Sequence, residues 1–195
     1  MKITLPDNSS RELPEGSSGY DLAKDIGPGL VKSAVAVTIN GIQKDLHDVI
    51  EGDVSASIIT IDSDEGIEIM RHTLTAQVLA RALKNIYPSS KLAIGPTIDD
   101  GFYYDIETED AISIDDLEKI EDEMIKIVKT KSSITKKLVG KEDALKIFKS
   151  QKETYKESII EESEQINDFQ LYYQDDEKFV DLSLIHISEP TRPTR

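Results

Sequence analysis

The sequence contains no cysteine among its 195 residues. That absence excludes a disulfide framework, a thiolate nucleophile and a cysteine metal site. Long apolar runs are also missing, since no segment approaches the roughly 20 apolar residues that span a bilayer. Residues 1–5 alternate like the start of a strand and lack the basic-then-apolar pattern of a signal peptide. We therefore expect a soluble cytoplasmic protein without membrane contact.

Positive charge is scarce, with 23 Lys and Arg against 38 Asp and Glu and a formal net charge of -15. A free-standing nucleic-acid binder normally carries a basic face, so the charge argues against that class. The acidic residues concentrate at Asp105–Asp122 and Glu153–Glu177, where they are expected to coat solvated helix faces. Contact with RNA would need a basic surface supplied by a larger parent protein.

Residues 1–61 contain the helix caps and turn signals expected of a compact unit. Ser17 or Ser18 can cap a helix that Gly27-Pro28-Gly29 ends, and Asn40-Gly41 is a strong tight-turn signal. The expected elements are strands at 2–5, 11–13, 34–39, 42–44 and 54–61 and a helix at 20–26. The order β-β-α-β-β-β predicts a β-grasp module, in which a helix lies across one curled sheet.

Beyond a polar linker at residues 62–66, the pattern predicts a second unit over residues 67–182. A helix is expected over Ile67–Ile86, with a buried stripe formed by Met70, Leu74, Val78, Ala82 and Ile86. Further helices are expected at 115–129 (with Ser113 as N-cap), 142–150 and 155–162, and strands at 133–139, 170–173 and 179–182. Because helices and strands do not alternate as in a βαβ series, the unit is predicted to be α+β.

The segment Lys91–Asp105 predicts a hairpin rich in turn-forming residues. The turn formers Gly95, Pro96 and Gly101 stand where the chain is expected to reverse, and Asp99 and Asp100 are expected to serve that turn rather than a metal. Tyr103 and Tyr104 alternate across a strand, so only one of them can face a pocket while the other packs.

Residues 183–195 break the pattern by changing abruptly from acidic sequence to Pro, Thr and Arg. The stretch resembles translated adapter DNA at the end of a truncated gene, so it is left out of the fold argument. We accordingly expect a fragment whose native sequence continues past Leu182. No role is assigned to His186, and His47 is expected to be a plain surface or turn residue.

The first unit resembles the TGS module of bacterial threonyl-tRNA synthetase, a module also found in certain GTPases and stringent-response enzymes. The similar stretches are Leu22–Leu30, Val37–Gly41 and Ile58–Thr60. A TGS-like unit alone points only weakly to one function, because several protein classes carry it.

The second unit resembles the editing domain of the same synthetase family, which removes serine wrongly attached to threonine tRNA. The matching motifs are Arg71-His72, the stretch Ala76–Ala80, the run Ile94–Asp105, the pair Tyr155-Lys156 and the stretch Phe179–Leu182. The resemblance implies His72 and Lys156 as catalytic editing residues, and it implies as substrate-binding residues Gln77, Gly95, Tyr103, Tyr104 and Asp181.

Two departures separate this chain from the family pattern. The second histidine of the family's helix motif appears here as Gln77, with one extra residue between it and His72, so an α-helix would set the two roughly 140° apart. The family's Cys-Arg-Gly-Pro-His segment is also missing, and Ser183 stands in the cysteine's place. We therefore expect no aminoacylation and little or no seryl-tRNA deacylation.

The resemblance also implies a double sieve. One methyl group separates serine from threonine and is worth only ~1–3 kcal/mol in a pocket, so a second hydrolytic site has to reject threonine. A histidine can exchange protons near neutral pH, a lysine can stabilise the oxyanion or protonate the leaving ribose oxygen, and Asp181 can hold the substrate's ammonium.

No cofactor and no metal are expected in this chain, where Gly27-Pro28-Gly29 lacks the lysine of a phosphate-binding loop. The resemblance places ATP, Mg and zinc in the parent enzyme's later catalytic domain. It implies tRNA(Thr) as partner of the full-length enzyme, and a homodimer formed through other domains.

Plainer interpretations stay open beside these. His72 can be a capping or surface residue, Lys156 a solvated helix lysine and Asp181 a turn residue. The whole chain can also be a stand-alone trans-editing aminoacyl-tRNA hydrolase, or a non-enzymatic regulatory or ribosome-associated module built on the β-grasp unit. A pocket around His72, Lys156 and Asp181 is what separates the enzymatic hypotheses from the last one.

Overall fold

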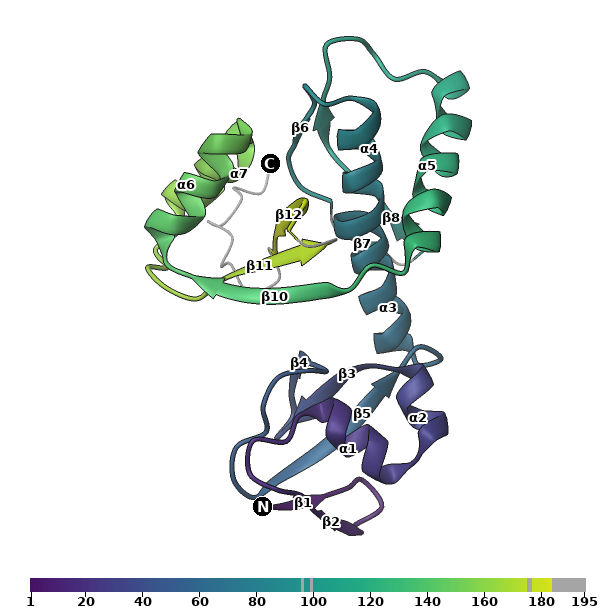
Figure 1. Cartoon of the computed structure of the whole chain (residues 1–195), viewed down its shortest axis with the longest axis vertical. Coiled ribbons are helices and arrows are strands. Elements are labelled where there is room, and N and C mark those ends of the chain that lie inside the picture. The colour runs from purple at the N-terminus through teal and green to yellow at the C-terminus, as the bar shows by residue number, and fades with distance from the viewer. Residues whose placement is uncertain (96, 99, 175–176, 184–195) are drawn as a thin grey trace, which may run out of the picture. The chain divides into compact units, whose positions relative to one another are not determined.

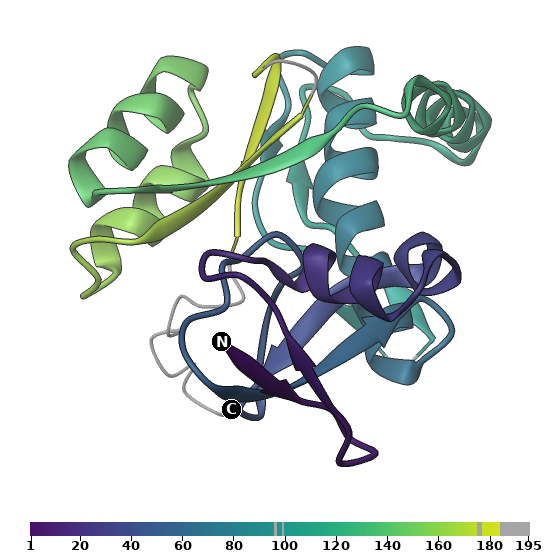
Figure 2. The ribbon, with the colours of Figure 1, turned by 60° about the horizontal axis from the view of Figure 1, so that its bottom comes forward.

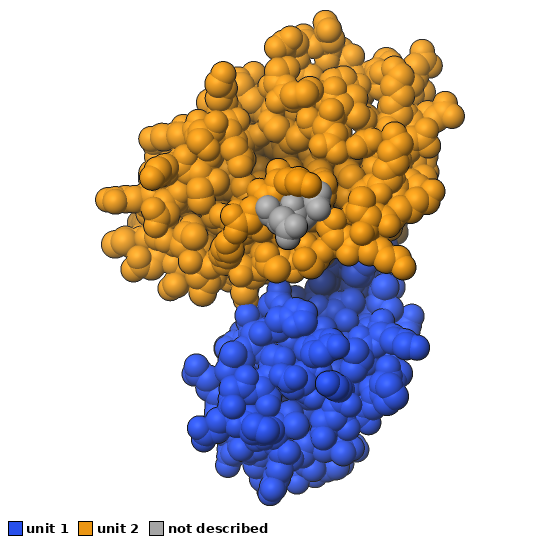
Figure 3. All heavy atoms as spheres, in the orientation of Figure 1, with its two compact units in different colours: residues 1–71 blue, residues 72–195 orange. Residues whose placement is uncertain are grey.

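The computed structural model describes residues 1–95, 97–98, 100–174 and 177–183. The chain is a mixed α+β protein that divides into two compact units, residues 1–71 and residues 72–195 (Figures 1 and 3). Each unit has its own core, so each is taken in turn.

Unit 1 is built on a five-stranded sheet with two helices. Its elements are β1 Lys2–Thr4, β2 Ser10–Glu12, α1 Gly19–Ile26, α2 Pro28–Ser33, β3 Ala34–Ile39, β4 Ile42–Asp45 and β5 Val54–Thr60. The strand order is β2-β1-β5-β3-β4, and β1 pairs with β5 in parallel while the other pairs are antiparallel. The expected strands therefore form one sheet, consistent with a β-grasp domain.

Local signals place the first helix and the tight turn as expected. Ser18 and Asp21 form a capping box that starts α1. Asn40 and Gly41 both have positive φ, 50° and 82°, which suits the two-residue hairpin between β3 and β4. The helix then packs Leu22 into the core, and this side chain is 0% exposed. The core of unit 1 consists of Ile3, Leu22, Val37, Ile39, Ile50 and Ala56.

The Gly27-Pro28-Gly29 segment does not simply end the helical region. Gly27 has an extended backbone with φ 164°, and Pro28 starts a second short helix, α2. Proline is well suited to the first helical position because its missing N–H has no partner there anyway. The segment is a break between two helices, and the expectation of a single helix was wrong here.

A long helical segment runs from Asp64 to Ile86 and crosses the boundary between the units (Figure 1). It comprises α3 Asp64–Thr73, a π-helix over Leu74–Leu79 and α4 Ala80–Ile86. The helix starts inside the linker predicted at 62–66 because the Ser63 hydroxyl accepts the Gly66 N–H at 3.0 Å.

The π-helix changes which side chains of this segment are buried. A π-turn inserts one residue into the helix, so the residues on either side of it no longer follow one 3.6-residue stripe. Of the predicted stripe, Val78 and Ala82 are buried, whereas Met70 is 39% exposed. The segment also buries Thr75 and Gln77, which the stripe did not include.

The segment after α4 forms the predicted hairpin, but it reverses only at its far end. β6 Lys91–Leu92 pairs with β9 Ile106–Glu107, and β7 Thr97–Ile98 pairs with β8 Gly101–Phe102. Between these pairs, Ala93 and Asp105 are joined by a backbone hydrogen bond. Gly95 therefore lies within the arm of the hairpin, while the predicted turn residues Pro96 and Asp99 lie outside the described residues.

The rest of unit 2 adds a helix, a three-stranded antiparallel sheet and a helical pair. The elements are a 3₁₀-turn Ile114–Asp116, α5 Leu117–Thr130, β10 Ile134–Val139, α6 Lys141–Gln151, α7 Thr154–Glu162, β11 Phe169–Gln174 and β12 Phe179–Leu182. Ser113 caps the 3₁₀-turn as expected. Residues 175 and 176, between β11 and β12, lie outside the described part of the chain.

Two layers of unit 2 meet at β12. On one face of the sheet, Phe148 and Ile160 of α6 and α7 pack against Leu171 and Val180. On the other side, Phe179 packs against the cluster of α4, the hairpin and α5. Successive strand residues point to opposite faces, so Asp181 shares the face of Phe179. This alternation brings Asp181 to the boundary between the two sides. Figure 2 shows the ribbon of unit 2 from a second direction.

Candidate functional site

A buried ion pair marks the centre of the candidate site in unit 2. The Lys156 ammonium donates a hydrogen bond to Asp181 Oδ1, and each of the two side chains is only 4% exposed. The same carboxylate oxygen accepts the Leu182 N–H at 2.9 Å. Lys156 also lies over the ring of Phe148, with Nζ 5.5 Å from the ring centroid. Lys156 is therefore no solvated surface lysine.

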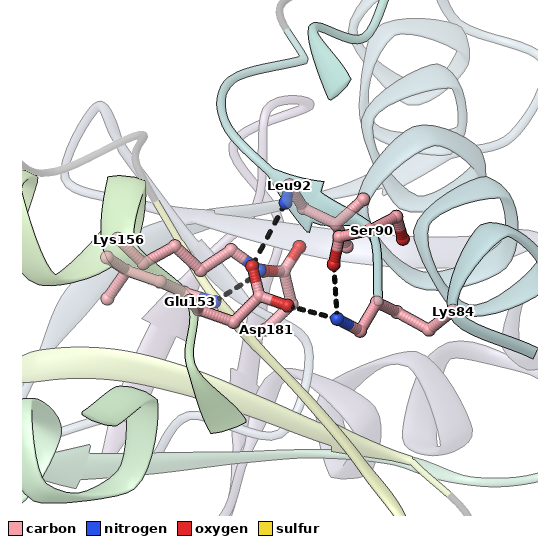
Figure 4. Close-up of polar contacts among 7 residues, drawn as sticks. Lys84, Ser90, Leu92, Glu153, Lys156 and Asp181 are labelled. Carbon is pink, nitrogen blue, oxygen red and sulfur yellow. Dashed lines mark hydrogen bonds and ion pairs between the residues drawn. The ribbon is translucent and has the colours of Figure 1, made fainter. Parts of the chain in front are cut away.

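A second ion pair involves the residue just before α7, and Figure 4 shows it beside the first. Glu153, which is 2% exposed, accepts the Lys84 ammonium at 2.6 Å on Oε1 and the Leu92 N–H at 3.0 Å on Oε2. Lys84 also donates to the Ser90 carbonyl oxygen at 2.6 Å. These contacts tie α4, β6 and α7 together.

Tyr104 lies close enough to both carboxylates to respond to their charges. Burial raises the pKa of the Tyr104 phenol far above its usual value, and the negative charges of Asp181 and Glu153 raise it further. The phenol therefore stays protonated at any physiological pH, so it can act as a neutral hydrogen-bond donor or acceptor. Its ring also packs against the core of the hairpin and α4.

Gly95 stands where the hairpin comes closest to the helix. A Cβ on Gly95 would lie 2.3 Å from Tyr104 Cδ2 and 2.7 Å from Thr75 Cγ2. Gly95 is not among the glycines with positive φ. The residue is thus required by close packing, whereas the sequence had suggested a turn at this position.

The π-helix contributes the buried amide of Gln77. Gln77 is 5% exposed, and its Oε1 has no hydrogen-bond partner among the described residues. His72 is partly buried at the end of α3, just before the π-turn. A π-turn carries an extra residue, so the angle between His72 and Gln77 falls below the roughly 140° expected for an α-helix. Their approach to Lys156 stays a prediction.

The structure brings together only part of the predicted set. Lys156, Asp181, Tyr104 and Gly95 belong to one cluster. Tyr103, in contrast, is 49% exposed. His186 lies outside the described residues, and His47 is an exposed residue whose ring faces that of Tyr20 at 5.4 Å.

Sequence reasoning missed Lys84, Glu153 and Thr75. Lys84 and Glu153 looked like ordinary charges on helix surfaces, and only their contact across a long stretch of intervening chain reveals their burial. Thr75 becomes buried only because the π-turn changes the face of the helix. The sequence signal for that turn was the extra residue between His72 and Gln77.

Unit 1 is also identifiable by comparison with known families. The family model of the TGS domain matches residues 1–60. Residues 1–60 are a TGS domain. The match ends at the last residue of β5, so it covers the whole five-stranded sheet.

The candidate site lies outside the TGS domain, in unit 2. Among the described residues, no group of three or more His, Asp or Glu side chains is placed to hold a metal ion. Within the same residues, no helix combines the length and apolarity needed to cross a membrane. The side chains gathered at the site supply two ammonium groups, two carboxylates and a neutral phenol.

Proposed function

We propose that the chain is the N-terminal part of a threonine–tRNA ligase, with the TGS domain followed by a proofreading unit that recognises serine esterified to the tRNA's terminal ribose. The observation that carries the proposal is the buried Lys156–Asp181 pair beside Tyr104 and Gly95. The proposed partner is tRNA(Thr), bound by the full-length enzyme. In that enzyme ATP would serve the aminoacylation step.

The chemistry of the pair suits an aminoacyl ester. Asp181 can exchange its bond to Lys156 for one to the α-ammonium of the amino acid, since both are cationic donors. Lys156 is then released to stabilise the developing oxyanion or to protonate the ribose oxygen as it leaves. The two residues thus neutralise each other without substrate and take separate roles with it.

Discrimination against threonine fits the close contact at Gly95. The Tyr104 ring and the Thr75 methyl already fill the space in which a Cβ on Gly95 would lie. In the proposed pocket these two groups would form part of the wall, and a tightly packed wall rejects one added methyl at a cost of about 1–3 kcal/mol by overpacking.

Slow hydrolysis is expected even where binding is specific. The proposal gives Gln77 the place at which a base would help to activate water, and an amide cannot accept a proton at neutral pH. The amide can still orient a water molecule through its buried Oε1.

Binding is therefore the sharpest test. The probes are serine and threonine amides of 3′-amino-3′-deoxyadenosine, which mimic the charged tRNA end and cannot be hydrolysed as esters. Calorimetry should show the serine amide binding about 10- to 200-fold more tightly than the threonine amide. Asp181→Asn should abolish that binding, while the exposed-site control Glu161→Gln should preserve it. Equal affinity for both amides and for adenosine would refute the proposal.

A non-enzymatic TGS module is the second candidate, because the TGS domain also fits regulatory proteins. It predicts that both units fold and that neither amide binds.

A further inference from the structure

The Lys156–Asp181 pair joins α7 to β12, and α4 contacts the surroundings of each element through a different side chain. Lys156 lies on α7 and Asp181 on β12. The apolar side chains of α4 point elsewhere, because Ala80 and Leu83 pack with the hairpin and α5. The polar residues Arg81 and Lys84 make the contacts from α4 to the other layer, so they are the place to look for what sets the geometry of the pair.

Lys84 holds the start of α7. Its ammonium contacts Glu153, the residue just before α7 and three positions before Lys156. Both carboxylate oxygens of Glu153 are engaged, one by Lys84 and the other by the Leu92 N–H. Two charge-assisted contacts in different directions leave the helix start little freedom to slide or rotate. Lys156 follows on the next turn.

Arg81 holds the strand beside β12. Its Nη1 donates to Gln174 Oε1 at 2.6 Å, and Gln174 is 4% exposed. Gln174 ends β11 and pairs with Phe179 of β12, two residues before Asp181. The Arg81 contact therefore ties the hairpin that carries Asp181 to the same helix that holds α7.

We infer that Lys84 and Arg81, through Glu153 and Gln174, are positioning residues that hold Lys156 and Asp181 in register for the ester. This inference rests on the proposed function for its meaning, but its geometric content can be tested without it. Burying an ion pair such as Lys84–Glu153 generally costs more than an apolar replacement, so a stability role alone explains it poorly.

The test removes both charges at once. In Lys84→Gln/Glu153→Gln, the introduced amide keeps an acceptor for the Leu92 N–H, so unit 2 is expected to melt near the wild-type temperature. Competitive acetylation, read by mass spectrometry, then reports the exposure of the Lys156 amine relative to that of exposed Lys152. We expect Lys156 labelling to rise about 5- to 30-fold, because local opening around the pair becomes easier.

A second variant covers the case in which the double variant does not fold. Glu153→Asp keeps the charge but shortens the side chain by one methylene, so only the position of α7 is perturbed. Labelling of Lys156 should rise here as well, and affinity for the serine amide should fall about tenfold. The control Lys149→Gln/Glu161→Gln removes an exposed pair between α6 and α7 and should change neither readout.

The outcomes separate the two proposals. Unchanged Lys156 labelling and unchanged amide affinity in folded variants would overturn the positioning role. Increased labelling in a protein that never binds the serine amide would sink the proposed function and leave the positioning of the pair supported.

Discussion

The two units bury different kinds of side chain. Every residue of unit 1 is described, and its buried side chains are apolar. Its ion pair Arg11–Asp25 lies at the surface, with the two side chains 42% and 40% exposed. Unit 2 contains all the buried polar and charged residues found in the described part of the chain: Thr75, Gln77, Ser90, Glu153, Lys156, Gln174, Asp181 and Ser183.

This contrast separates a unit with an apolar interior from one that also buries paired charges. Burying charges is costly unless each is paired and hydrogen-bonded, and the usual return is a defined geometry or a reactive group. The TGS domain buries an apolar core against its five-stranded sheet. Unit 2 accepts the cost of two buried ion pairs at one place, and that place is the candidate site.

The largest expected effect comes from breaking the central pair. Lys156→Met leaves the Asp181 carboxylate buried without its counter-ion, so unit 2 should lose about 3–5 kcal/mol in urea unfolding. Lys156→Met/Asp181→Leu should recover most of that loss. In unit 1, Arg11→Gln should cost less than about 1 kcal/mol because its pair is exposed. Equal losses in both units would contradict the contrast.

Unit 1 should respond instead to loss of apolar volume. Leu22→Ala creates a cavity beneath the sheet at a fully buried position, and we expect a loss of about 2–5 kcal/mol. Hydrogen exchange followed separately for each unit should show faster opening of the strands of unit 1 alone. Exposed Ile42→Ala, at a position 64% exposed, is the matched control and should have little effect.

A smaller effect is expected from filling the space at Gly95. Gly95→Ala should destabilise unit 2 by about 1–3 kcal/mol, because the new methyl meets the Tyr104 ring and Thr75. Adding Thr75→Ser removes one of the two clashing groups and should restore part of the loss. An unchanged melting temperature in Gly95→Ala would show that the space between Gly95, Tyr104 and Thr75 is larger than the structure indicates.

The smallest effect is confined to high pH. Tyr104 has a raised pKa in the folded protein, so its neutral form is favoured and its contribution is intact below the unfolded value of about 10. As pH rises above that value the unfolded chain ionises first, and unit 2 should lose stability. Tyr104→Phe should flatten this loss between about pH 10 and 11, measured by urea unfolding. An identical slope in both proteins would contradict the burial of the phenol.

Much of the fold was predictable because its signals are local. The capping box at Ser18, the turn at Asn40-Gly41 and the cap at Ser113 each act within a few residues of the element they start or end. Gly27 ends α1 as expected, but Pro28 also begins a second helix, α2, which was not expected. The local signal allows both roles, since proline ends one helix as readily as it begins another.

The candidate site was only half predictable. The family resemblance pointed to Lys156, Asp181, Tyr104 and Gly95, which the structure places in one cluster. It pointed equally to Tyr103, which is exposed. Nothing in the sequence near Lys84 or Glu153 distinguishes them from surface charges, because their burial depends on each other.

By itself, the sequence determined the alternation of strands, the helix caps and the acidic surface, all of which follow from neighbouring residues. Only the tertiary structure decided that a π-turn would bury Thr75 and Gln77, that Gly95 would touch an aromatic ring, and that two ion pairs would be buried together. Such features depend on the packing of segments distant in sequence. The electrostatic energy of a charged side chain depends on its distance to other charges and on the local dielectric, and both are set by the packing of the folded chain.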